Sequence, residues 1–134
     1  MDRPVFGTVS LYESLAASLN ADPVWRELAI PITYTMVYAY LPPVDKRFYL
    51  RFDAGEIVEV RELDPAEDPA VDFVISAKPD VWAALITLEM NPTAAMATGK
   101  VKIKGKQTVL LRHMKRFSYL IDRLCHLDPA FPST

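Results

Sequence analysis

The chain has 134 residues and a formal net charge of −2, and 51% of its residues are hydrophobic while 24% are charged. This size and composition predict one globular domain over residues 1–134 and exclude a disordered chain, while the single cysteine excludes an internal disulfide and a zinc site built from several cysteines. No apolar stretch approaches the ~18 residues of a membrane-spanning helix, and the N-terminus does not resemble a signal peptide, so we expect a cytoplasmic protein.

The first two predicted elements are helices. Leucines recur every four residues between residues 8 and 20, which is the spacing of one helical face. Asp22 followed by Pro23 is typical of an N-cap with proline in the first helical turn. This pattern predicts a short second helix that ends near Leu28.

Strands are predicted to follow these helices. Residues 33–41 alternate between two faces that are both largely apolar, which indicates a strand partly covered on both sides. Residues 47–53 and 56–62 flank an Asp-Ala-Gly turn and predict a hairpin in which Val58 and Val60 point inward.

The second half of the chain is predicted to mix strands and helices. Residues 71–76 form the fourth strand, and two helices follow, one from Pro79 and one over residues 92–98. A fifth strand at residues 101–105 leads into the longest helix, over residues 107–125. Because most strands follow one another through short turns, the order predicts an α+β domain. We expect a five-stranded, mostly antiparallel sheet covered by helices on one face.

Motifs of enzymatic chemistry are absent from the sequence. It contains no G-x-S-x-G, HExxH, P-loop or G-x-G-x-x-G pattern. Cys125 and His126 are adjacent at the end of the last helix, where successive side chains point about 100° apart, so we do not expect them to act as a nucleophile and its base. We expect His113 on the charged surface of the same helix. The sequence therefore predicts no catalytic residue, no cofactor and no metal site.

Charge is distributed unevenly along the chain. Residues 53–72 hold eight acidic residues and one basic residue, whereas residues 100–123 hold eight basic residues and one acidic residue. Four lysines alternate with apolar residues and are expected on the outer face of one strand: Lys100, Lys102, Lys104 and Lys106. They either protect an edge strand from pairing with another sheet or contact anionic lipid or an acidic partner. Nucleic acid is not expected, because no aromatic residues interleave with these lysines.

Residues 91–105, NPTAAMATGKVKIKG, resemble the sterol carrier protein 2 (SCP2) family. That family carries a proline and a helix of small residues, and then a strand in which lysines alternate with hydrophobic residues between two glycines. The matching positions here are Pro92, Ala95, Met96 and the segment from Gly99 to Gly105. The preceding VDFVISAKPDVWAALI is similar to the strand and helix that lead into the family motif, and the order of elements agrees over nearly the whole chain.

The resemblance implies an apolar tunnel that holds a sterol, a fatty acid or a fatty acyl-CoA without covalent chemistry or a cofactor. We expect its lining where apolar faces converge between the sheet and the later helices, at Phe73, Trp82, Leu85, Met96, Leu110, Met114 and Phe117. Periodicity alone does not distinguish such a cavity from a filled core. The chain does not end in Ser-Lys-Leu, so peroxisomal targeting is not expected.

Alternative functions from different classes remain open. The first is non-catalytic binding, with transfer, of a hydrophobic ligand by a domain that contacts anionic membranes transiently. The second is an interaction or dimerisation module, including a homodimer, that completes a larger enzyme or pathway complex. An enzyme of a polyketide or steroid pathway is the third and least favoured alternative.

Overall fold

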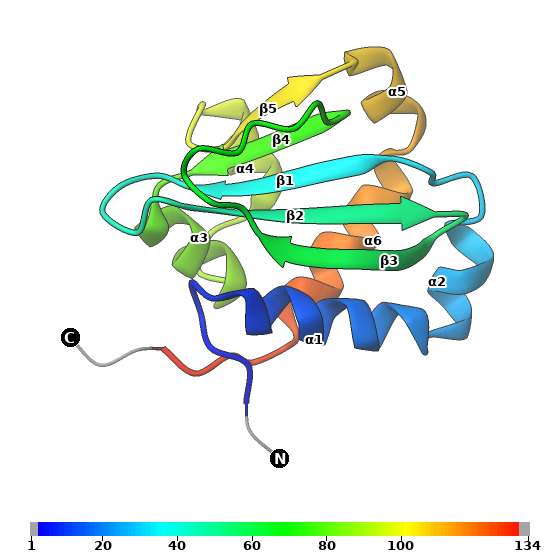
Figure 1. Ribbon diagram of the computed structural model, residues 1–134, viewed down its shortest axis with the longest axis horizontal. Helices are drawn as coiled ribbons and strands as arrows, with labels where there is room; N and C mark the ends of the chain where they lie inside the picture. The colour runs from blue at the N-terminus through cyan, green and yellow to red at the C-terminus, as the bar shows by residue number, and fades with distance from the viewer. Residues whose placement is uncertain (1–2, 132–134) are drawn as a thin grey trace.

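The structure of the protein is a computed structural model in which residues 3–131 are described, and the Pro-Ser-Thr terminus lies outside the described residues. Helices and strands follow the predicted order (Figure 1). Their bounds are α1 (Val9–Asn20), α2 (Pro23–Leu28), β1 (Thr35–Tyr40), β2 (Lys46–Asp53), β3 (Glu56–Glu62), β4 (Phe73–Ala77), α3 (Pro79–Ile86), α4 (Pro92–Ala97), β5 (Lys102–Gly105), α5 (Gln107–Arg112) and α6 (Met114–Cys125).

The five strands form one sheet in the order β3-β2-β1-β4-β5. Strands β1 and β2, β2 and β3, and β4 and β5 pair antiparallel, but β1 and β4 pair parallel. The sheet is therefore mixed but mostly antiparallel, which confirms the expectation, and its one departure is the parallel pair of β1 and β4. The physical reason is the segment of residues 63–72, which carries the chain from the β3 edge back across the sheet, so that β4 adds to the free side of β1.

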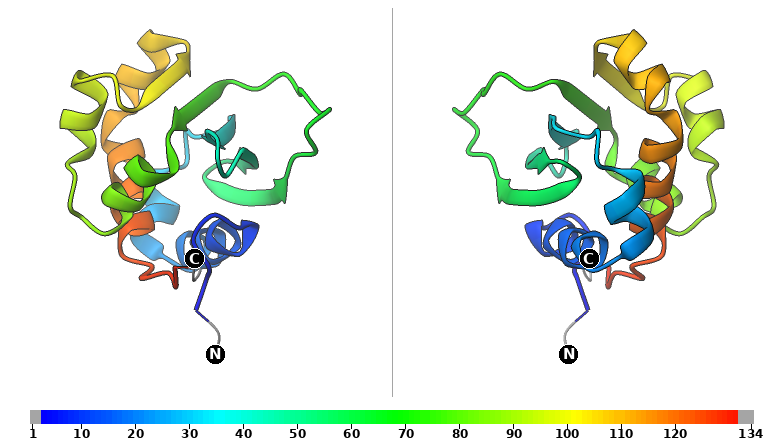
Figure 2. Two further views of the ribbon diagram at one scale, coloured as in Figure 1. Left: turned by 90° about the vertical axis from the view of Figure 1, so that its left-hand side faces the viewer. Right: turned by 90° about the vertical axis from the view of Figure 1, so that its right-hand side faces the viewer.

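The helices lie on one side of the sheet, and the connection between β3 and β4 bulges out on the other side (Figure 2). Because this connection contributes Leu63 to a small second cluster with Val37 and Ala39, both faces of β1 are covered. The partly covered central strand predicted from the apolar alternation is thus confirmed, since every residue from Met36 to Tyr40 is buried.

The predicted hairpin forms between β2 and β3, but its register contains a bulge. Phe52 pairs with Ile57 whereas Arg51 pairs with Glu59, so Val58 has no partner across the ladder. Ile57 is consequently buried and Val58 is 40% exposed. The prediction that Val58 points inward is therefore wrong, because the extra residue reverses the alternation that the sequence shows.

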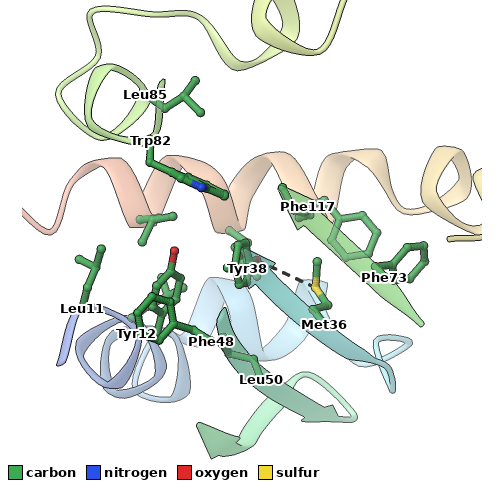
Figure 3. Close-up of a cluster of buried hydrophobic side chains, with 14 of the residues drawn as sticks. Leu11, Tyr12, Met36, Tyr38, Phe48, Leu50, Phe73, Trp82, Leu85 and Phe117 are labelled. Atoms are coloured by element: carbon green, nitrogen blue, oxygen red, sulfur yellow. Dashed lines mark hydrogen bonds between the residues drawn. The ribbon is translucent and has the colours of Figure 1, made fainter. Parts of the chain in front are cut away.

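A cluster of aromatic side chains fills the space between α1 and the sheet. The Tyr12 ring stacks on Tyr38 and on Phe48, with ring centroids 5.0 and 5.1 Å apart, and its hydroxyl lies 2.9 Å from that of Tyr40 (Figure 3). These side chains are fully buried and in close contact. These aromatic side chains therefore fill the space that they enclose between α1 and the sheet.

The long C-terminal helix predicted over residues 107–125 is two helices, α5 and α6, which meet at His113. His113 is 6% exposed, so its predicted place on the charged surface is also wrong. Arg116 lies next to the break, where it donates to the carbonyl oxygen of Leu28 over 2.7 Å and to Nδ1 of His113 over 3.1 Å. The contact with Leu28 joins α6 to the end of α2, and no local sequence pattern reveals it.

Candidate ligand pocket

A pocket of about 300 Å³ lies between strands β1, β4 and β5 and helices α3 to α6. This volume is at the lower end of the ~300–1,000 Å³ of small-molecule sites. All seven side chains expected in the lining contribute to this one pocket, namely Phe73, Trp82, Leu85, Met96, Leu110, Met114 and Phe117. Their contact with a ligand remains a prediction.

The deep wall of the pocket is rigidly positioned. Trp82 is 1% exposed, and its indole N–H donates to the carbonyl oxygen of Ala39 over 3.0 Å. Phe73 and Phe117 pack edge to face with ring centroids 5.6 Å apart, so strand β4 and helix α6 meet at this point (Figure 3). Side chains fixed by packing and hydrogen bonding favour a cavity that exists before any ligand arrives.

Several lining residues were missed by sequence reasoning. From the sheet and the residue before β5 these are Met36, Ile75, Ile103 and Val101, and from α6 they are Ser118, Ile121, Asp122 and Cys125. On α6 the lining positions recur at intervals of three and four residues from Met114, so they share one helical face. That spacing could have identified Ser118 and Asp122, but their polarity places them outside any search for apolar faces.

The mouth of the pocket combines polar and apolar side chains. Its polar members are all exposed and come from the start of α4 and from α6: Asn91, Thr93, Ser118 and Asp122. Two exposed apolar side chains join them, Leu88 at 61% and Met114 at 37%. The pocket therefore has an apolar interior and a polar, solvent-facing rim, which is the arrangement that suits an amphiphile.

Cys125 lies in the pocket wall, and not simply at a helix end. Its thiol donates to the carbonyl oxygen of Leu85 over 3.0 Å, and burial, with a smaller effect of Asp122, raises the pKa of the thiol to about 11. A thiol of this kind is a poor nucleophile near neutral pH. His126 is exposed and bonds to the carbonyl oxygen of Asp122 through Nδ1, so the two residues do not face each other.

His113 is the other histidine of the chain, and it belongs to the packing of α5 against α6. Its Nδ1 accepts from Arg116, and its Nε2 lies 3.5 Å from the Tyr34 hydroxyl. Burial, together with the charges of Arg116 and Arg112, lowers the pKa of His113. Residues 3–131 contain no group of three or more His, Cys, Asp or Glu side chains placed to hold a metal ion.

The four lysines lie around the edge strand β5, which pairs only with β4. All four are exposed, but only Lys102 and Lys104 are within the strand, because β5 ends at Gly105 and Lys106 precedes α5. None of the four lysines lines the ligand pocket, which takes Val101 and Ile103 from the same segment. A second hollow of about 590 Å³ lies on their side and includes Lys78, Lys100, Lys102 and Asp80 in its lining.

The described residues thus form an α+β domain in which helices cover a mixed sheet and border an apolar pocket. The chain belongs to the SCP-2 sterol transfer family, whose sequence model matches residues 16–118. Comparison with curated proteins gives no match. Among residues 3–131, no helix combines the length and the apolar character needed to cross a membrane.

Solved structures share this fold at low sequence identity. A crystal structure of sterol carrier protein 2 matches with a TM-score of 0.78 and 18% identity over 90% of this chain and 97% of that one. The solution structure of a Thermus thermophilus protein, described as possibly a sterol carrier protein, matches with a TM-score of 0.76 and 16% identity over 99% and 96% of the two chains. The sec-alkylsulfatase Pisa1 from Pseudomonas sp. matches with a TM-score of 0.56 and 14% identity, over 92% of this chain but 16% of the sulfatase.

Proposed function

We propose that this protein is a non-catalytic carrier that binds a hydrophobic ligand, such as a sterol or a fatty acyl compound, in the pocket between the sheet and α3 to α6. The observation that supports the proposal most directly is the pocket itself, with its apolar interior and polar rim. Membership of a sterol transfer family agrees with it.

The physical basis of binding is the removal of apolar ligand surface from water. Each 100 Å² of such surface contributes about 2.5 kcal/mol at about 25 cal/mol per Å². Because the deep wall is built from buried aromatic and aliphatic side chains, a hydrocarbon chain needs no specific polar partner there. Selectivity then depends on the rim, where a polar head group stays in contact with water.

A blocking substitution tests this proposal. Ser118 is exposed and lines the pocket, so Ser118→Trp is expected to fill the mouth without disturbing the buried core. Ser18→Trp is the matched control, because Ser18 is exposed on α1 and outside the pocket lining. In displacement of a fluorescent fatty acid, we expect Ser118→Trp to weaken binding at least tenfold and Ser18→Trp to leave it unchanged. Equal binding by both variants would contradict the proposal.

Identification of a co-purifying molecule provides an independent measurement. Native mass spectrometry of the purified protein, followed by organic extraction, is expected to show an apolar molecule bound one to one. The Ser118→Trp protein should carry less of it than the Ser18→Trp protein. This comparison works whichever apolar molecule the protein carries.

Contact with an anionic membrane is part of the proposed transfer step. Exposed lysines around β5, together with Lys78 at the neighbouring hollow, concentrate positive charge at one edge of the sheet. Near an anionic bilayer each such residue contributes about 1 kcal/mol of attraction. Docking through this edge leaves the pocket wall untouched, because none of the four lysines lines the pocket.

A second function is favoured by one observation. The matched part of the sec-alkylsulfatase is 16% of that enzyme's chain, so this fold also occurs as a small portion of a large enzyme. By analogy, the chain would act as an interaction or dimerisation module. A ligand-free dimer in native mass spectrometry would support the module, and a ligand-bound species would support the carrier.

A further inference from the structure

We propose that the pocket selects amphiphiles with a neutral hydroxyl head over those with an anionic head, and that Asp122 sets this selectivity. The inference rests on the proposed function, and it narrows the ligand class to long-chain or polycyclic alcohols. It concerns the rim of the pocket, where the polar end of a bound amphiphile must lie.

The first argument is the charge of the lining. Among the described residues that line the pocket, Asp122 is the one with a charged side chain. None of the four lysines around β5 lines the pocket, and Lys115 and Arg116 of α6 are also outside the lining. An anionic head at this mouth would therefore approach a carboxylate without a lining cation to offset it.

The second argument is hydrogen-bond complementarity. A carboxylate only accepts hydrogen bonds, so Asp122 is satisfied by a ligand group that donates. At the same rim, Ser118 offers a hydroxyl, and Asn91 offers its amide nitrogen because its Oδ1 already accepts from the backbone of Thr93 and Ala94. An alcohol head can donate to Asp122 and accept from Ser118 or Asn91, whereas an ionised carboxylate head can only accept.

Two basic side chains position the Asp122 carboxylate from outside the pocket. Arg123 donates to Oδ2 over 3.0 Å, and Nδ1 of His126 lies 3.7 Å from Oδ1. Neither residue lines the pocket. The ion pair with Arg123 weakens the field of the carboxylate, so the expected discrimination is a matter of severalfold and not of orders of magnitude.

Matched ligands and matched variants test the inference. The probes are dodecan-1-ol and dodecanoate, which share a chain length and differ in the head group, each displacing a fluorescent fatty alcohol. The variants are Asp122→Asn and, as a control with the same chemical change, Asp68→Asn, which is exposed in the connection between β3 and β4. Circular dichroism checks that both variants fold, which is expected because the Asp122–Arg123 pair is largely exposed.

We expect the wild-type protein to bind dodecan-1-ol more tightly than dodecanoate. Asp122→Asn should strengthen dodecanoate binding about fivefold, which is the size expected for one charge–charge contact near a surface. The preference for dodecan-1-ol over dodecanoate should therefore become smaller in this variant. Asp68→Asn should behave as wild type, and 1 M salt should reduce the wild-type preference.

The outcomes separate the two proposals. A preference for dodecanoate in the wild-type protein, or an unchanged preference in Asp122→Asn, would overturn the selectivity while leaving the carrier function intact. Failure of both ligands to displace the probe, together with equal behaviour of Ser118→Trp and Ser18→Trp, would overturn the carrier function and the selectivity with it.

Discussion

The indole nitrogen of Trp82 lies 3.0 Å from the carbonyl oxygen of Ala39, and this hydrogen bond joins α3 to the central strand β1. The Trp82 ring also stacks on Tyr40, with centroids 5.0 Å apart, so one side chain anchors the helix and forms part of the pocket wall. Trp82 therefore contributes to stability and, under the proposed function, to ligand binding.

Trp82→Phe is expected to lower the free energy of unfolding by about 2 kcal/mol, because it removes a buried hydrogen bond and leaves a cavity. Trp25→Phe is the matched control, since Trp25 is also fully buried and donates to the carbonyl oxygen of Gly55 over 2.7 Å, but lies outside the pocket. Urea denaturation should show a similar loss in the free energy of unfolding for Trp82→Phe and Trp25→Phe. Only Trp82→Phe should weaken binding of the fluorescent fatty acid. Unaltered binding in Trp82→Phe would show that this wall does not contact the ligand.

Gly105 allows β5 to approach the pocket wall closely. Its φ is +144°, and a Cβ atom there would lie 2.5 Å from the carbonyl oxygen of Asp72 and would also overlap the Phe73 ring. Gly99, with φ of +77°, has open space where its own Cβ atom would lie. We expect Gly99→Ala to cost about 1 kcal/mol from backbone strain alone, and Gly105→Ala to cost clearly more. Equal losses of stability for Gly99→Ala and Gly105→Ala in urea denaturation would contradict the close approach of Gly105 to Asp72 and Phe73.

The buried His113 predicts a loss of stability on mild acidification. Its pKa is lowered by burial and by Arg116 and Arg112, so the folded state favours the neutral ring. The stabilisation is complete above the ordinary histidine pKa of about 6.5 and is lost as the pH falls through the lower folded value. Between pH 7 and pH 5, the wild-type protein should therefore lose more stability than His113→Gln. If stability fell equally with pH in the wild-type protein and in His113→Gln, the predicted effect of the His113 ring would be contradicted.

Cys125 serves as a reporter of pocket occupancy. Because its pKa is raised to about 11, labelling by iodoacetamide at pH 8 should be far slower than in the urea-unfolded protein, and bound ligand should slow it further. Cys125→Ser and His126→Ala are each expected to retain ligand affinity within about twofold, since neither supplies chemistry. Rapid labelling in the folded protein, or loss of binding in a folded variant, would contradict this view of the thiol.

The lysines around β5 are expected to act on transfer and not on binding. Replacing Lys100, Lys102, Lys104 and Lys106 by glutamine should slow transfer of a fluorescent lipid from anionic vesicles at low salt. Vesicles of neutral lipid and high salt are the controls, because both remove the attraction. An unchanged rate on anionic vesicles would leave edge protection as the role of these residues.

Much of the local structure follows from the sequence. Apolar spacing located α1 and α3, the Asp22-Pro23 and Asn91-Pro92 pairs marked the starts of α2 and α4, and side-chain capping bonds are present at both. These signals are local, because capping and amphipathic periodicity depend on residues only a few positions apart. Apolar periodicity together with the resemblance to the SCP2 family predicted the seven apolar residues that the structure places around one pocket.

The tertiary structure alone decided which strands are neighbours, where α5 ends and which polar residues meet the pocket. The parallel pairing of β4 with β1 depends on how the 63–72 connection crosses the sheet, and the break at His113 lies beside a contact between Arg116 and Leu28, which are far apart in the chain. Asp122 joins the lining only because α6 and the start of α4 border the same pocket. These features arise from contacts between segments far apart in the chain, and the free energy of such contacts is not encoded in any local pattern.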